Sequence, residues 1–394
     1  MKKVSEVFWQ FLILGCLSFG GPAAHLGYFQ TAFVQKLKWL DNSAYSRLIA
    51  LSQFLPGPGS SQVGFAIGLR RAGIWGGIAA FVGFTLPSFL LMYFIVLAST
   101  DFATNDILSG VIHGLKLLAV VVVADATYTM FQAFCKEKLA IVIAAFTAIF
   151  LLCIPSLSIQ IFALLIAALV GAYYGVPNKS GAPSKSGAPS KAVKPAKQGI
   201  KLLPLALFIA LLVGLPFVAY LSAPVGIFTD FYQAGSLVFG GGHVVLPLLQ
   251  QTLSETISTD RFLLGYATAQ AVPGPMFTLA TFLGAELSPS QQLLGALLAT
   301  LGIFLPGLLL VLSFQGAWES LAAKPKVAGA SWGINAAVVG LLFSAFYNPI
   351  FTSAVATPID MAIVVLGLLL MKTMKTPIIF MVIGFAGCGV LLQL

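Results

Sequence analysis

Apolar stretches with almost no charge alternate with short polar segments along the whole chain. The first half contains such stretches at 7–35, 48–69, 72–100, 107–124, 139–154 and 157–176, and the second half at 202–221, 231–254, 262–285, 290–318, 327–347, 355–371 and 376–394. Most approach or exceed the roughly 20 residues that an α-helix needs to cross a bilayer. The pattern predicts an all-α polytopic membrane protein with about 12–13 membrane segments.

The composition excludes a soluble fold. Hydrophobic residues make up 59% of the chain and charged residues only 8%, whereas a soluble domain carries about 25% charged residues. The net charge of +9 includes six lysines from one acid-free segment, namely Lys179, Lys185, Lys191, Lys194, Lys197 and Lys201. We therefore expect the lipid bilayer as a partner, and not a nucleic acid.

The lysine-rich segment divides the chain into two parts. Residues 177–201 read PNKSGAPSKSGAPSKAVKPAKQGIK, contain a tandem SGAPSK duplication and are poor in bulky apolar side chains. Such a composition cannot bury a core, so it predicts a flexible basic linker, which the positive-inside rule assigns to the cytoplasm. The linker separates an N-terminal repeat, residues 1–176, from a C-terminal repeat, residues 202–394, which has one extra helix at 202–221.

The two parts repeat each other. SFGGPAAH at 18–25 matches VFGGGH at 238–243, SQFLPGPG at 52–59 matches AQAVPGPM at 269–276, TLPSFLLM at 85–92 matches FLPGLLLV at 304–311, and HGLKLLAVVV at 113–122 matches WGINAAVVGL at 332–341. The distance from Pro87 to Gly114 is 27 residues, and the distance from Pro306 to Gly333 is also 27. The shared order and spacing indicate an internal duplication.

The charges that flank equivalent segments have opposite signs in the two repeats. Arginines precede 72–100 and aspartates follow it, whereas a glutamate precedes 290–318 and lysines follow it (Arg70, Arg71, Asp101 and Asp106; Glu286, Lys324 and Lys326). If positive charges stay inside, the repeats have inverted topology, as in many secondary transporters. Lys36, Lys38 and Arg47 violate this scheme, which favours a re-entrant 7–35 or 48–69.

Each repeat contains a Pro-Gly-Pro tripeptide, Pro56-Gly57-Pro58 and Pro273-Gly274-Pro275. Two prolines around a glycine predict a broken helix, and a break at membrane depth needs protein or a watery cavity beside it. The helix that restarts presents free N–H groups and a positive dipole end to an anion. Polar donors follow the first break (Ser60, Ser61, Gln62), whereas Met276, Phe277 and Thr278 follow the second. The alternative is a pair of kinks that only shape packing.

Glycine-rich interruptions precede the breaks in both repeats, Phe19-Gly20-Gly21-Pro22 and Phe239-Gly240-Gly241-Gly242. They indicate either close helix packing through small residues or a second pair of broken helices. His25 and His243 follow them, and each is either a proton-linked group or a buried polar residue with a partner.

Ionisable residues inside the apolar stretches are further candidates, because an intramembrane charge is functional by default. Lys116 favours an anionic ligand, and its counterpart in the second repeat is Asn335. The alternative is an ion pair with Asp125, although a helical offset of about 180° opposes it. Arg70 either guides anions at a cavity mouth or anchors the membrane border. Asp125 and Asp360 are candidate proton carriers.

The chain carries no motif of an enzyme. It has no P-loop, no zinc-type cluster, no haem-like histidine pair and no Ser-His-Asp pattern, and it contains 3 histidines in total. We therefore expect no catalysis, no cofactor and no metal.

The motifs together resemble the chromate ion transporter family, in its long, two-domain form. They are FGGPAAHLGYF at 19–29, LSQFLPGPGSSQVGFAIGLRRAGIWGG at 51–77, and VFGGGHVVLPLL with AQAVPGPMFTLATFLGA in the second repeat, so the resemblance covers nearly the whole chain. Family positions match Phe19, Gly20, Gly21, His25, Gln53, Pro56, Gly57, Pro58, Gly64, Gly68, Arg70 and Gly73, with the counterparts Gly240, Gly241, His243, Gln270, Pro273, Gly274 and Pro275.

This resemblance implies a plasma-membrane transporter that exports chromate, confers chromate resistance and accepts sulfate as a competing oxyanion. Export needs no ATP, because a dianion leaving an inside-negative cell gains about 4.6 kcal/mol per 100 mV. We expect the oxyanion site between the two breaks near the bilayer midplane. Side chains of Ser60, Ser61, Gln62, Gln53 and Gln270 would donate hydrogen bonds there, and the half-helix N-termini and Lys116 would add positive potential.

Two alternatives stay open. One is proton-coupled uptake of sulfate or a related oxyanion, with His25, His243 and Asp125 as the proton-linked residues. The other is an anion channel or a membrane scaffold, which counterflow of labelled anion would separate from a carrier. A homodimer is also left open.

Overall fold

The computed structural model describes residues 2–19, 21–100, 106–174, 199–239, 245–253, 255–318, 321 and 324–392. These residues form helices joined by short connections, with no strand among them, as the apolar pattern predicts. The first repeat contains α1 (Lys2–Leu17), α2 (Gly21–Phe29) with the π-helical η1 (Gln30–Lys36), α3 (Asn42–Phe54), α4 (Gly59–Thr100), α5 (Asp106–Phe134), α6 (Lys138–Cys153) and α7 (Leu157–Tyr174).

The second repeat follows the extra helix α8 (Leu202–Val218), which ends in η3 (Ala219–Leu221). It contains α9 (Ala223–Leu237), α10 (Val245–Leu253), α11 (Thr259–Ala271), η5 (Met276–Thr278), α12 (Leu279–Leu287), η6 (Pro289–Gln291), α13 (Gln292–Phe314), α15 (Pro325–Ala345), η7 (Phe346–Phe351), α16 (Thr352–Ala354), α17 (Pro358–Lys372) and α18 (Ile378–Leu391).

Five of the described helical stretches are long and apolar enough to cross a membrane. They are Gly59–Ser99, Ser109–Phe134, Leu202–Leu221, Pro289–Phe314 and Pro325–Ala354. The predicted segment 7–35 is instead divided between α1 and α2–η1, and 48–69 between α3 and α4. The 13-residue α3 is about 20 Å long, which is short of the roughly 30 Å bilayer core.

The long helix α4 is two segments joined by a sharp turn at Gly73. Ala72 and Gly73 have non-helical backbone angles, and Gly73 has φ +65°. A Cβ on Gly68 would overlap the carbonyl oxygen of Gly76. Residues this far apart lie about 12 Å from each other in a continuous helix, so the chain reverses at Gly73. Gly284 of α12 and Gly295 of α13 pack in the same way.

The duplication is visible in equivalent helix contacts. In the first repeat, a Cβ on Gly83 of α4 would lie 2.6 Å from the carbonyl oxygen of Phe8 of α1. In the second repeat, a Cβ on Gly302 of α13 would lie 2.9 Å from the carbonyl oxygen of Phe228 of α9. Glycine therefore allows the first helix of each repeat to approach the matching long helix closely.

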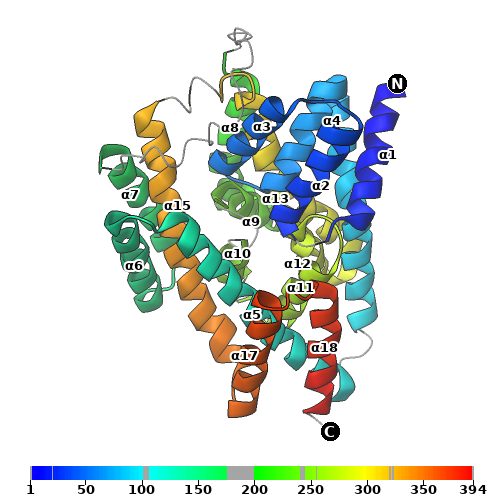
Figure 1. The fold of residues 1–394 in the computed structure, drawn as a ribbon, viewed down its shortest axis with the longest axis vertical. Helices are drawn as coiled ribbons and strands as arrows, with labels where there is room; N and C mark the ends of the chain where they lie inside the picture. The colour runs from blue at the N-terminus through cyan, green and yellow to red at the C-terminus, as the bar shows by residue number, and fades with distance from the viewer. Residues whose placement is uncertain are drawn as a thin grey trace.

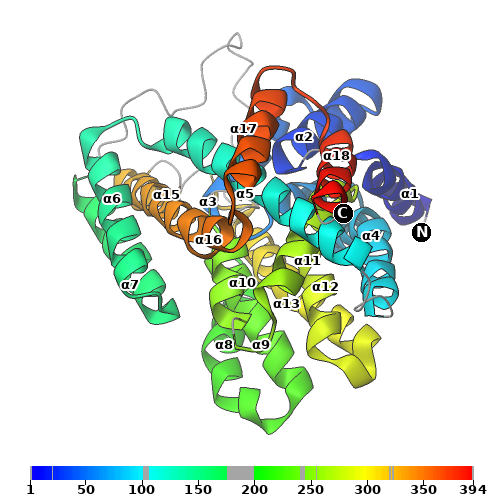
Figure 2. The same cartoon turned by 90° about the horizontal axis from the view of Figure 1, so that it is seen from below.

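The later helices pair across the repeats. In both views α5 lies beside α18, and α15 lies beside α6 and α7 (Figures 1 and 2). A Cβ on Gly114 of α5 would overlap the carbonyl oxygen of Phe385, and a Cβ on its counterpart Gly333 of α15 would overlap that of Ala167. Each repeat therefore completes its packing with helices of the other.

This exchange predicts a position-specific effect on α18. A Cβ on Gly389 would overlap the carbonyl oxygen of Gly110, whereas a Cβ on Gly387 meets no atom within 4 Å. We expect Gly389→Ala to destabilise the protein by about 1–3 kcal/mol, because the α5–α18 contact must separate. Thermal unfolding of the detergent-purified protein measures this, with Gly387→Ala as the matched control. Equal melting temperatures for the two variants would contradict the packing described.

Candidate functional site

Each Pro-Gly-Pro tripeptide separates two helices, as the sequence predicts. The first lies between α3, which ends at Phe54, and α4, which begins at Gly59. The second lies between α11, which ends at Ala271, and η5. The central residues Gly57 and Gly274 have φ +123° and +100°, in the region that favours glycine.

The two breaks contact each other's repeats reciprocally. The Gly57 N–H donates to the carbonyl oxygen of Val238, just after α9 (2.8 Å), and the Gly274 N–H donates to that of Ser18, just after α1 (2.9 Å). Ser18 and Val238 are equivalent positions in the repeated motif. An exchange of identical contacts is the mark of an approximate two-fold relation, so both breaks lie where the repeats meet.

Polar side chains from α2 and α4 gather at the first break. His25 of α2 lies with its Nδ1 3.2 Å from the Ser60 Oγ on the first turn of α4, and its ring stands edge-on to Phe84, 5.2 Å between centroids. Gln62 Nε2 donates to the carbonyl oxygens of Pro56 (2.8 Å) and Gly307 (3.3 Å). The structure therefore places the predicted Ser60, Ser61, Gln62 and His25 beside the first break, and their role in binding stays a prediction.

Five buried polar atoms of this region have no hydrogen-bond partner within the described part of the chain. They are Ser18 Oγ, His25 Nε2, Ser61 Oγ, Gln62 Oε1 and Thr85 Oγ1, on residues that are at most 4% exposed. An unsatisfied buried polar group costs about 1–3 kcal/mol, which is large against a total stability of about 5–15 kcal/mol. Water or a polar ligand is required to satisfy them.

The second break differs because the described polar side chains beside it, Thr278 and Gln270, have local partners. Thr278 Oγ1 donates to the Pro275 carbonyl oxygen (2.8 Å), and Gln270 Nε2 lies 2.6 Å from Met276 Sδ. The counterparts of Ser18, Thr85 and Ser88 are Val238, Phe304 and Gly307. The two breaks share a backbone design, but among the described residues the unpaired polar groups beside a break lie at the first.

Several predicted site residues are exposed or half-buried, unlike these buried groups. Gln53 is exposed on α3, Phe19 is 38% exposed, and Asn335 is half-buried on α15. Arg70 is exposed near the end of the helix that starts at Gly59, about 16 Å from the break along its axis. Gly21 begins α2 with φ +77°. The predictions for Gly20, Gly240, Gly241 and His243 fall outside the described residues.

The intramembrane charges are compensated by partners far away in sequence. Lys116 Nζ lies 2.7 Å from Asp260 Oδ1 on the first turn of α11, and Asp125 pairs with Lys372. His113 Nε2 lies 2.7 Å from Asp360 Oδ1, and Asp360 also forms a capping box with Thr357. Lys116 thus contacts the end of α11 opposite the second break, and its role in anion binding stays a prediction.

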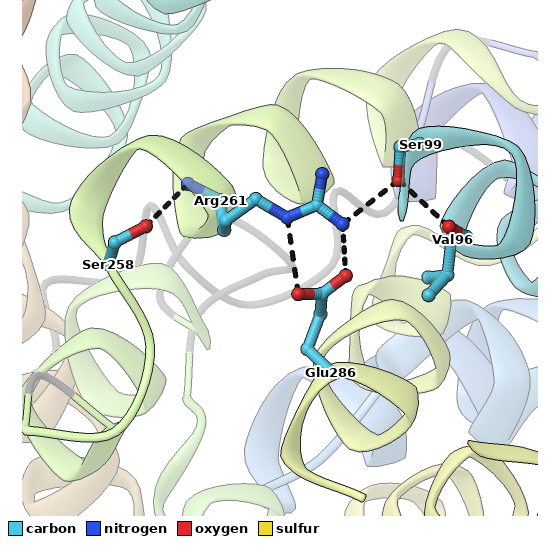
Figure 3. Close-up of polar contacts among 5 residues, drawn as sticks. All are labelled: Val96, Ser99, Ser258, Arg261 and Glu286. Atoms are coloured by element: carbon cyan, nitrogen blue, oxygen red, sulfur yellow. Dashed lines mark hydrogen bonds and ion pairs between the residues drawn. The ribbon is translucent and has the colours of Figure 1, made fainter. Parts of the chain in front are cut away.

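A second ion pair fixes the same turn of α11. The Arg261 guanidinium pairs with Glu286 of α12 and donates from Nη2 to Ser99 Oγ at the end of α4 (2.9 Å; Figure 3). It also lies over the ring of Phe282. Together with Asp260 it attaches α11 to α4, α5 and α12. The equivalent residues of α3 are Ser43 and Ala44, so this attachment belongs to one repeat.

Sequence reasoning missed Ser18, Thr85 and Arg261. The alignment of the two repeats contained a signal for the first two. Ser18 and Thr85 carry hydroxyl groups, whereas the aligned residues of the second repeat, Val238 and Phe304, are apolar. For Arg261 the local sequence held none, since its partners come from two other helices.

Comparison with known proteins gives one family. The family description "Chromate transporter" matches residues 5–172 and 225–390. A chromate transport protein of Pseudomonas aeruginosa is 25% identical, covering 97% of this chain and 91% of that protein. One of Cupriavidus metallidurans is 26% identical over 98% and 92%, and an uncharacterized transporter of Methanocaldococcus jannaschii is 26% identical over 86% and 82%. No solved structure matches.

Proposed function

The chain belongs to the chromate transporter family, and from that premise we propose that it exports chromate through an oxyanion site at the first Pro-Gly-Pro break. The observation that carries this proposal is the group of four buried potential donors, Ser18 Oγ, His25 Nε2, Ser61 Oγ and Thr85 Oγ1, that have no partner within the described residues. Hydroxyl groups and an imidazole N–H donate well to the oxygens of a tetrahedral dianion. Free N–H groups at the start of the α4 helix add positive potential.

The site needs no fixed cation. A buried dianion held by an arginine or lysine would dissociate slowly, whereas neutral donors and a helix dipole bind it and still release it. Sulfate has the same shape and charge as chromate, so these donors accept both, and sulfate competes for the site.

The membrane potential drives export in this proposal. Two negative charges leaving an inside-negative cell gain about 4.6 kcal/mol per 100 mV, which corresponds to roughly a thousandfold concentration ratio. Cells that expel chromate in this way across the plasma membrane become resistant to it.

Inverted repeats provide the route. The reciprocal contacts of Gly57 and Gly274 support a two-fold relation between the repeats, and the reversed flanking charges favour an axis in the membrane plane. Alternating access then follows from rocking one repeat against the other around the breaks, with the linker on the cytoplasmic side.

A second candidate is proton-coupled oxyanion uptake. The observation that favours it is the buried imidazole of His25, whose Nε2 has no partner in the described part of the chain. A proton on this nitrogen would offset one charge of the anion, and transport would then depend on a pH gradient.

Transport by the purified protein in vesicles distinguishes potential-driven export from proton-coupled uptake. We expect efflux of labelled chromate to accelerate when the vesicle interior is made negative, to slow when it is made positive, and to be inhibited by sulfate. Internal unlabelled chromate should drive counterflow, as a carrier requires. Flux that ignores the potential but follows an imposed pH gradient would establish the proton-coupled alternative.

A further inference from the structure

A groove lies on the flank of the molecule, away from both breaks. It has a volume of about 540 Å³ and is bordered by α5, α6 and α15, including Tyr128, Phe131, Ile141, Ala145, Leu152 and Phe343. In both views α6 and α15 lie on the side of the molecule opposite α1 (Figures 1 and 2). The groove therefore joins helices of the first repeat to a helix of the second.

The lining of the groove is apolar. The hydroxyl of Thr127 donates to the Val123 carbonyl oxygen (2.7 Å), and the Tyr128 hydroxyl accepts from Gln132 Nε2 (2.7 Å). The remaining lining side chains are alanine, isoleucine, leucine, phenylalanine, valine and glycine. Both polar side chains of the lining already form hydrogen bonds within the protein, so the groove is suited to a hydrocarbon chain.

The length of the groove suits a lipid chain. Along α6 the groove extends from Ile141 to Leu152, about 16 Å, which is close to one leaflet of a bilayer core of roughly 30 Å. An acyl chain of one leaflet therefore spans the groove from end to end.

Two lysines mark one end of the groove. Lys138 begins α6, one turn before Ile141, and Lys136 lies in the turn after α5. Both are exposed and neither forms an ion pair within the described residues. The neighbouring Glu137 is the one opposing charge of this turn. Lys372, which lies over the ring of Tyr128, is already paired with Asp125.

We propose that this groove binds an anionic phospholipid, with one acyl chain along α6 and the phosphate of the headgroup at Lys136 and Lys138. A basic site at the end of an apolar groove between helices is suited to an anionic headgroup, and each lysine adds roughly fivefold in affinity. The lipid bridges the two repeats where α6 packs on α15.

Titration of phosphatidylglycerol and phosphatidylcholine into the detergent-purified full-length chain, read by native mass spectrometry, tests this proposal. Phosphatidylglycerol should bind the wild type more tightly. The double variant K136Q/K138Q should weaken its binding about 30-fold and leave phosphatidylcholine binding unchanged. The control K2Q/K3Q removes the same charge from α1 and should have no effect.

A separate substitution tests whether the acyl chain occupies the groove. Ala145 is exposed and lines the groove, so Ala145→Phe fills it without disturbing a buried contact. It should abolish tight binding of both lipids, whereas Val142→Phe, on an exposed position of α6 outside the lining, should retain it. Equal affinities for the two lipids, or tight binding by Ala145→Phe, would overturn the proposal. A change of Ala145→Phe from dimer to monomer, with lipid binding intact, would assign the groove to a second copy instead.

Discussion

Ser61→Ala is expected to raise the KM for chromate about 10- to 100-fold. The Ser61 hydroxyl is 3% exposed and has no partner in the described part of the chain, so in our proposal it donates to the bound dianion. A hydrogen bond to a charged group contributes about 1.5–3 kcal/mol, which corresponds to that range of affinity. Initial rates of labelled chromate flux in vesicles, normalised to the amount of inserted protein, measure the effect.

Two substitutions serve as comparisons for Ser61→Ala. Ser313→Ala removes an equally buried hydroxyl that donates to its own helix at Leu309, and we expect the KM to stay near the wild-type value. Thr278→Val changes the counterpart of Ser61 in the second repeat, whose hydroxyl donates to Pro275. Its effect should be much smaller than that of Ser61→Ala. If both repeats respond equally, the donor set is not confined to the first break.

Gly57→Ala is expected to remove most of the transport activity and to lower stability. At φ +123° an alanine is strained by about 1–3 kcal/mol. Its Cβ would also lie 2.9 Å from the Gly307 Cα and 3.1 Å from Gln62 Nε2. The Gly307 Cα is a backbone atom of α13 and cannot rotate away. The overlap is therefore removed only if the two repeats separate at the break. Thermal unfolding and chromate flux together measure this.

Nearby glycines provide the controls for Gly57→Ala. A Cβ on Gly59 would meet ordinary contacts of 3.7 Å or more, so Gly59→Ala should retain transport. Gly274→Ala should lie between the two, since its closest neighbour is the Ser88 hydroxyl at 2.9 Å, which can rotate away. Wild-type flux in Gly57→Ala would show that the break tolerates a side chain, and the site geometry would then be wrong.

The sequence predicts the fold class and the breaks because those depend on local properties. Apolar stretches form helices in lipid, and two prolines around Gly57 or Gly274 interrupt a helix in any context. The repeated motifs place equivalent residues at equivalent points. The candidate site at Ser60, Ser61 and Gln62 follows from the same reasoning, since these residues occupy the first turn after a break.

Helix pairing could not be predicted, because apolar helices in a membrane present no polarity difference that selects a neighbour. Close backbone approach at Gly114 or Gly333 decides it, and glycines of the same kind occur throughout the chain. The ion pairs could not be predicted for a related reason, because their partners are far apart in sequence. Lys116 and Asp260 are 144 residues apart, and Lys116 has Asp125 as a nearer carboxylate in sequence.

The segment 7–35 shows a third limit of prediction from the sequence. Its apolar content predicts one span, yet Gly21, with φ +77°, starts a new helix within it. The interruption places His25 beside the first break. Of the two interpretations given for the glycine-rich motifs, the broken helix is therefore the one found in the first repeat.

The unequal polarity of the two breaks sets the stoichiometry of the proposed transport cycle. A symmetric duplication would offer two equivalent places for substrate, and occupancy of one would influence the other. Among the described residues, the unpaired donors beside the breaks are Ser18, His25, Ser61 and Thr85, so in our proposal one anion is moved per turn of the cycle. Flux then rises hyperbolically with chromate concentration, without cooperativity, and each turnover carries two elementary charges across the membrane as a measurable current.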